Sequence, residues 1–92
     1  MSVPTCDVCK RNKSIGVACV PGVPFSAAYC RECLAANAHP VDVLIAQTAC
    51  MVGGMSHAAG WWKLMVSDTL THLGKSQRWF NAQVRKSMKE TL

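Results

Sequence analysis

The sequence has no apolar run before its first cysteine pair, since residues 1–13 read MSVPTCDVCKRNK. A secretory signal requires an apolar segment of about 7–15 residues. We therefore expect a protein of a reducing, cytoplasmic compartment, where structural disulfides are rare. Six cysteines in 92 residues then need another role, because so short a chain gains only a thin stability margin from its core.

Formal charges are missing from residues 43–62, a stretch about as long as the ~20 residues of a membrane-spanning helix. Its composition argues against that interpretation, because polar side chains need partners in lipid and glycines weaken a lone helix. The residues concerned are Gln47, Thr48, Ser56 and His57, together with Gly53, Gly54 and Gly60. We expect buried helices of a soluble domain here and no membrane association.

A catalytic set is also lacking, because no nucleophile, base and orienting group stand at spacings typical of an active site. His57 and His72 have no partner at catalytic or metal-binding spacing, and we expect each to be a surface or packed residue. The sequence therefore predicts a protein that is not an enzyme.

Four of the cysteines form two Cys-x-x-Cys pairs, Cys6 with Cys9 and Cys30 with Cys33. Such a turn directs two thiolates at one ion, and two turns complete the tetrahedral shell that zinc prefers. The 20 residues between the pairs are at the upper edge of the usual spacing for zinc sites. The pattern predicts one structural Zn²⁺ with a filled shell.

The cysteines and one histidine have alternative interpretations. A redox role for a Cys-x-x-Cys pair would need a βαβ unit, which this order of segments does not supply. His39 could replace a cysteine as ligand, but four thiolates fill the shell, so we expect a capping role or solvent contact. Cys19 and Cys50 are expected in a strand and in a buried helix as small hydrophobes, with a reactive thiol as the alternative.

The segment between the cysteine pairs favours a β-hairpin, because Val-rich and aromatic stretches, 14–20 and 25–29, flank a Pro-Gly turn. Good helix formers follow Cys30, and Pro40 ends that short helix.

This order of a cysteine knuckle, a hairpin and a helix opened by the second pair resembles a treble-clef zinc finger over residues 5–39. A zinc ribbon shares the cysteine spacing and stays open as an alternative. Treble-clef knuckles often place a glycine after the second cysteine, where this sequence has Lys10. We expect a tighter or less regular turn at that position.

The whole chain also resembles small zinc-finger proteins of bacteriophage genomes. Two runs carry the likeness, GVACVPGVPFSAAYCRECL over residues 16–34 and LGKSQRWFNA over residues 73–82. That family has no settled activity, so the resemblance implies a phage or mobile-element origin and no particular function.

Two helices are expected in residues 41–73. Residues 41–52 are apolar on nearly every face, which predicts a helix that is buried all round. Gly53-Gly54 ends it, and residues 61–73 resume with apolar side chains over about half of the helical circumference. We expect one of Trp61 and Trp62 in the core and the other at its rim.

A last helix is expected over residues 75–92, because Phe80, Val84 and Met88 recur every four residues and Gly74 can end the helix before it. Cations gather within an arc of roughly 100° on the other side, with Glu90 as the only acid. We name these cations the basic face: Lys75, Arg78, Arg85, Lys86 and Lys89. Trp79 is expected beside Lys86, partly exposed.

These patterns predict a small α+β metal-stabilised domain. A four-cysteine zinc finger would occupy residues 1–40, and about three helices over residues 41–92 would pack on it to give one compact domain.

The basic face has an ordinary interpretation as a solvated helix surface. The sharper hypothesis is a non-enzymatic interaction protein that docks on a host protein or nucleoprotein machine and inhibits or redirects it, with Trp79 anchored in a pocket. The alternative is direct DNA or RNA binding by the same face. A zinc centre with four thiolates would lower the formal charge of +5 to about +3, which is modest for tight nucleic-acid binding. Pairing of two copies through the apolar middle also stays open.

Overall fold

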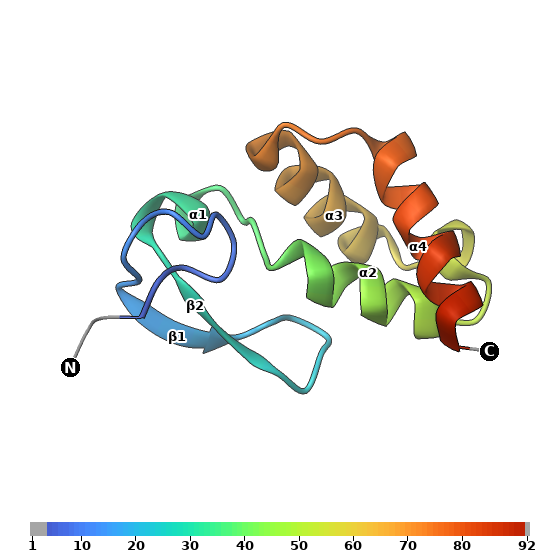
Figure 1. Ribbon diagram of the computed structural model, residues 1–92, viewed down its shortest axis with the longest axis horizontal. Coiled ribbons are helices and arrows are strands. Elements are labelled where there is room, and N and C mark those ends of the chain that lie inside the picture. Colours follow the sequence, from blue (N-terminus) through green and yellow to red (C-terminus); the bar gives the residue numbers. More distant parts are fainter. Residues whose placement is uncertain (1–3, 92) are drawn as a thin grey trace.

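The computed structural model describes residues 4–91, in which a β-hairpin and a short helix are followed by a helical region (Figure 1). The hairpin pairs β1 (Gly16–Cys19) with β2 (Ser26–Tyr29), antiparallel, with Gly16 opposite Tyr29. Helix α1 (Arg31–Ala35) follows directly. The predicted hairpin and short helix are therefore confirmed, and we call residues 4–39 the finger.

Three α-helices and one 3₁₀ turn make up the rest of the described chain. They are α2 (Val41–Cys50), η1 (Gly54–His57), α3 (Gly60–Leu73) and α4 (Gln77–Thr91). Gly74 ends α3 with a left-handed φ of 70°, as expected from the sequence. Helix α4 begins at Gln77 and not at Lys75, because the Ser76 hydroxyl accepts a hydrogen bond from the Trp79 N–H at 3.0 Å and so caps the helix.

The core of the helical region forms where α2, α3 and α4 meet (Figure 1). Leu44, Trp62, Val66 and Phe80 are almost completely buried there. The Trp62 indole N–H donates to the Thr48 hydroxyl at 3.0 Å, and that hydroxyl donates to the Leu44 carbonyl at 2.7 Å. The buried polar groups of this core are thus hydrogen-bonded, as the low dielectric of an interior demands.

The expectation that the first long helix is buried all round is wrong. In α2 only Leu44 and Thr48 are buried, whereas Asp42, Ala46 and Cys50 are exposed. Helices α3 and α4 cover one side of α2, and the other side borders solvent and the tip of the hairpin. Cys50 is exposed for this reason, and Cys19 is exposed because no layer covers β1, so neither packs as a small hydrophobe.

One contact between the hairpin turn and the helical region is made at Gly22. Gly22 has a φ of +77°, and a β-carbon on it would lie 2.6 Å from the Trp61 ring. Trp61 therefore rests on the turn and stays 55% exposed, while its neighbour Trp62 is buried, as predicted for a rim and a core residue.

Within residues 4–91, none of the helices combines the length and the apolar character that crossing a bilayer would require. The charge-free stretch that raised the question is divided among α2, η1 and the start of α3. The described residues form a small α+β fold with a two-stranded hairpin and four α-helices.

Candidate metal centre

The first cysteine pair lies in a tight turn that is tied to the hairpin. The Lys10 N–H donates to the Cys6 carbonyl at 3.0 Å and closes the turn. Lys10 itself has a left-handed φ of 59°, the conformation that a glycine adopts without strain. Lys10 therefore takes a backbone conformation that costs a lysine free energy and would cost a glycine none.

Asp7 fixes this turn to β2. Its backbone N–H donates to the Ala28 carbonyl at 2.8 Å, and its carboxylate accepts from the Ala28 N–H at 2.8 Å. The first pair is thereby held beside the end of β2, where the second pair begins.

The second cysteine pair lies at the start of α1. Cys30 is the N-cap residue, and its Sγ accepts a hydrogen bond from the Cys33 N–H at 3.5 Å. The far end of α1 closes with Asn37 at a left-handed φ of 55° and the Ala38 N–H bonded to the Cys33 carbonyl at 3.0 Å. This helix of only five residues is thus fixed at both ends.

The four sulfur atoms of Cys6, Cys9, Cys30 and Cys33 lie within 4.8 Å of one another. The Cys9 and Cys30 sulfurs are 3.9 Å apart, which is too far for a disulfide bond of ~2.05 Å. Three of the four side chains are buried and Cys9 is half-buried. The predicted residues therefore form one cluster that could hold a metal ion.

Two of these sulfur atoms accept hydrogen bonds from neighbouring amide groups. The Val8 N–H donates to Cys6 Sγ at 3.4 Å, and the Asn12 amide donates to Cys30 Sγ at 3.6 Å. The Cys33 N–H, then the Asn12 amide, lowers the pKa of Cys30 to about 6. Burial acts in the opposite direction on Cys33 and raises its pKa.

His72 is a neighbour of the cluster that the sequence did not predict. Its Nε2 lies 3.3 Å from Cys33 Sγ, although 39 residues separate the two. The imidazole reaches the site from the last turn of α3 and borders a polar pocket of about 310 Å³ with Arg11, Asn12 and Glu32. No spacing in the sequence signals this contact, which depends on how α3 packs against the finger.

His39 is neither exposed nor a helix cap, in contrast to the expectation. It is buried, with Nδ1 2.7 Å from the Tyr29 hydroxyl and Nε2 3.2 Å from the Asn37 side-chain oxygen. Burial lowers the pKa of His39 and raises that of Tyr29 to about 12. The neutral imidazole therefore accepts from the Tyr29 hydroxyl and donates to Asn37, which leaves His39 outside the cysteine cluster.

The residues of the basic face lie in three surroundings. Arg78, Arg85 and Lys89 are exposed on α4, opposite the buried Phe80. Lys86 borders a groove shared with Asp42 and Glu90. Lys75 precedes the helix and places its ammonium 5.3 Å from the centre of the half-buried Trp79 ring.

The fold and this centre define a class of small α+β proteins with a four-cysteine site that could hold one metal ion. Comparison with protein-family models, with curated proteins and with solved structures gives no match. The resemblance to phage zinc-finger proteins therefore stays a prediction.

Proposed function

We propose that the cysteine cluster holds one structural Zn²⁺ and that the chain is a non-enzymatic interaction protein. The observation that carries the metal assignment is the 3.9 Å separation of the Cys9 and Cys30 sulfurs. A tetrahedron with Zn–S bonds of about 2.3 Å has edges of about 3.8 Å. Four thiol ligands also disfavour Mg²⁺ and Ca²⁺, which prefer oxygen.

The proposed finger is of the treble-clef type. Its zinc would join the turn of residues 6–10 to the first residues of α1, and the Cys30 cap of that helix supports a treble clef over a zinc ribbon. With four thiolates bound, the ion has no open position for a substrate or an activated water. Its role would then be to hold the finger together.

The proposed partner is an acidic protein surface that meets α4. Arg78, Arg85 and Lys89 lie on one stripe, since steps of seven and four residues return to the same side of a helix. The stripe spans about 16 Å at ~1.5 Å per residue. The one salt bridge found in residues 4–91, Lys10 to Asp42 at 3.6 Å, lies elsewhere and leaves the stripe available.

Affinity capture with a matched pair of variants tests this proposal. The stripe variant Arg78→Ala/Arg85→Ala/Lys89→Ala removes three charges from α4. The control Lys13→Ala/Arg31→Ala/Lys63→Ala removes three exposed charges elsewhere. We expect a host protein that survives nuclease treatment to be captured by the wild type and by the control, and to be lost with the stripe variant.

Two results would contradict the proposal. Equal capture by the stripe variant would show that the partner does not bind through the cations of α4. Capture that disappears with nuclease, together with an affinity for DNA or RNA that falls steeply with salt, would favour the alternative of direct nucleic-acid binding. Metal content is measured separately, and purified protein without about one zinc per chain would refute the metal assignment.

A further inference from the structure

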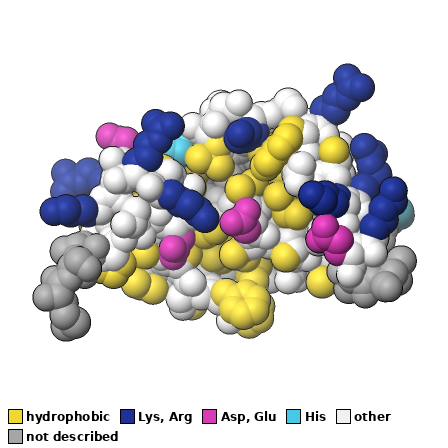
Figure 2. Space-filling view, viewed as in Figure 1, with side chains coloured by type: hydrophobic (Ala, Val, Ile, Leu, Met, Phe, Trp, Pro, Cys, Tyr) yellow, Lys and Arg dark blue, Asp and Glu magenta, His cyan; other side chains and the backbone are white. Residues whose placement is uncertain are grey.

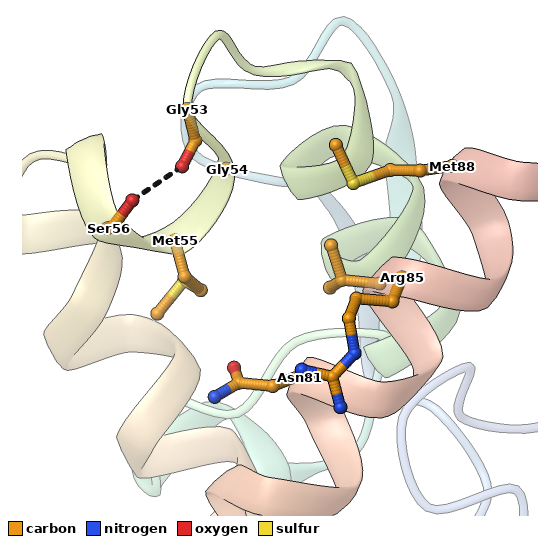
Figure 3. Close-up of a pocket in the computed structure, with 8 residues that line it drawn as sticks. Gly53, Gly54, Met55, Ser56, Asn81, Arg85 and Met88 are labelled. Carbon is orange, nitrogen blue, oxygen red and sulfur yellow. Dashed lines mark hydrogen bonds between the residues drawn. The ribbon is translucent and has the colours of Figure 1, made fainter.

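A small pocket opens beside the cationic stripe of α4 (Figure 3). One wall is the Gly53-Gly54 backbone with Met55 and Ser56, and the other comes from Asn81, Val84, Arg85 and Met88 on α4. Figure 3 shows Asn81 and Arg85 on the α4 side, across the pocket from Met55. Segments that are some thirty positions apart in the sequence therefore share one concave surface.

The chemistry of the pocket is apolar inside and cationic at its edge. Met55, Val84 and Met88 supply the apolar lining, and Arg85 supplies the charge. Its volume of about 270 Å³ lies below the ~300–1,000 Å³ that is typical of small-molecule sites. The space suits one apolar side chain, and methionine linings adapt readily to such an anchor.

The one charged side chain that lines the pocket is a cation, Arg85. Arg85 belongs both to the lining and to the stripe, and no acidic residue lines the pocket. The acids Asp42 and Glu90 instead border a separate groove between α2 and α4. Figure 2 shows Lys and Arg side chains at both ends of the molecule, the α4 end included, with hydrophobic side chains between the two ends. Carboxylates of a partner would meet complementary charge beside an apolar socket.

The same features favour a peptide over a nucleic acid. Single-stranded nucleic acids bind largely by stacking bases on exposed aromatic rings next to cations. Trp79, the aromatic residue nearest to the stripe in sequence, is half-buried and lies beneath the Lys75 ammonium. Trp61, which is 55% exposed, lies on the hairpin turn at Gly22 and not on α4.

We infer that the pocket is the anchor site for an acidic peptide segment of the partner, which inserts one aliphatic or aromatic side chain between η1 and α4 while its carboxylates contact Arg78, Arg85 and Lys89. This inference deepens the proposed docking function and rests on it. It adds a prediction that charge alone does not make, namely selectivity for one apolar residue within an acidic sequence.

Peptide titrations followed by ¹H–¹⁵N and methyl NMR test the inference on the full, zinc-loaded chain. The probes are a set of capped peptides with two glutamates on each side of a central Leu, Phe, Met or Ser. Burial of a Leu-sized side chain predicts that the best apolar peptide binds at least about tenfold more tightly than the Ser peptide. The largest shifts should fall on the methyl groups of Met55, Val84 and Met88.

Two variants test whether the preference for apolar peptides arises in the pocket. Met88 is 40% exposed, so Met88→Glu can be made without opening the core, and it should abolish the preference for apolar peptides. The matched control is Leu64→Glu, at an apolar residue of α3 that is 61% exposed and outside the pocket, which should leave the preference intact. Circular dichroism and zinc content confirm that both variants are folded.

The possible failures are distinguishable. Equal binding of the apolar and Ser peptides, still dependent on Arg78, Arg85 and Lys89, would overturn the anchor pocket and leave the docking function standing. Shifts confined to another surface would do the same. Absence of binding by every peptide, or tighter binding of an oligothymidylate than of any peptide, would overturn the inference together with the protein partner.

Discussion

Replacement of His72 is expected to weaken metal binding although His72 is not a ligand. A metal-bound Cys33 has no proton on sulfur, so the 3.3 Å contact requires that His72 Nε2–H is the donor. Outer-shell hydrogen bonds of this kind typically contribute 10–100-fold in metal affinity. Because the imidazole is exposed and water competes for it, we expect the lower end for His72→Phe, about tenfold or ~1.4 kcal/mol.

The assay is competition for Zn²⁺ with a chromophoric chelator, accompanied by the absorption spectrum of the Co²⁺-substituted protein. His72→Gln retains an N–H donor and should recover part of the lost affinity. His57→Phe is the matched control, because His57 is also exposed but contacts Ser56, at 3.2 Å, and not a cysteine. Its affinity should equal that of the wild type.

The prediction fails if His72→Phe binds zinc as tightly as the wild type, or if His57→Phe loses as much affinity as His72→Phe. An equal loss of zinc affinity in both variants, with the Co²⁺ spectrum unchanged, would indicate a general loss of stability. Only a loss specific to His72, with a shifted spectrum and partial recovery by Gln, supports the sulfur contact.

Three further predictions concern stability. A chelator should unfold the finger, since structural zinc in finger peptides contributes about 10–16 kcal/mol at pH 7, and an unchanged thermal transition with chelator present would refute this. Lys10→Gly should raise the free energy of unfolding by about 1 kcal/mol in denaturant titrations, because it relieves the left-handed φ of 59°. The exposed Lys10–Asp42 pair that it removes contributes little. Burial holds the pKa of His39 below its ordinary 6.5, so the unfolded chain takes up the proton first and stability falls as the pH drops below 6.5. His39→Gln should reduce that slope, and an equal slope in the variant would contradict it.

The parts of the fold that could be predicted are those set by local chemistry. A Cys-x-x-Cys turn, a Pro-Gly turn between a Val-rich and an aromatic segment, and Gly74 after an apolar helix each act over a few residues, and all appear in the structure. The cysteine cluster lies within the finger, where the Asp7–Ala28 hydrogen bonds hold the first cysteine turn beside β2 and so bring Cys9 next to Cys30.

The parts that could not be predicted depend on contacts between distant segments. The largely apolar composition of residues 41–52 indicates that burial is possible, but only the placement of α3 and α4 decides which side of α2 is covered. Cys50 is exposed for that reason. His72 shows the converse, because a histidine with no signal in the sequence comes to contact the cysteine cluster once α3 ends against the finger.

Helix α3 links the candidate metal centre to the surface that we assign to a partner. Near its end, Thr69 Oγ1 accepts the His39 N–H at 3.0 Å, Asp68 accepts from the Asn37 amide at 3.1 Å, and His72 contacts Cys33. Its buried face packs in the same core as Phe80 of α4. Since these contacts place α3 on the finger and α3 shares a core with α2 and α4, loss of the metal should disturb the arrangement of the Arg78–Lys89 stripe as well as the finger. Zinc content and partner binding should therefore decline together during stepwise chelation, whereas full binding by metal-free protein would show that the two ends of the molecule act independently.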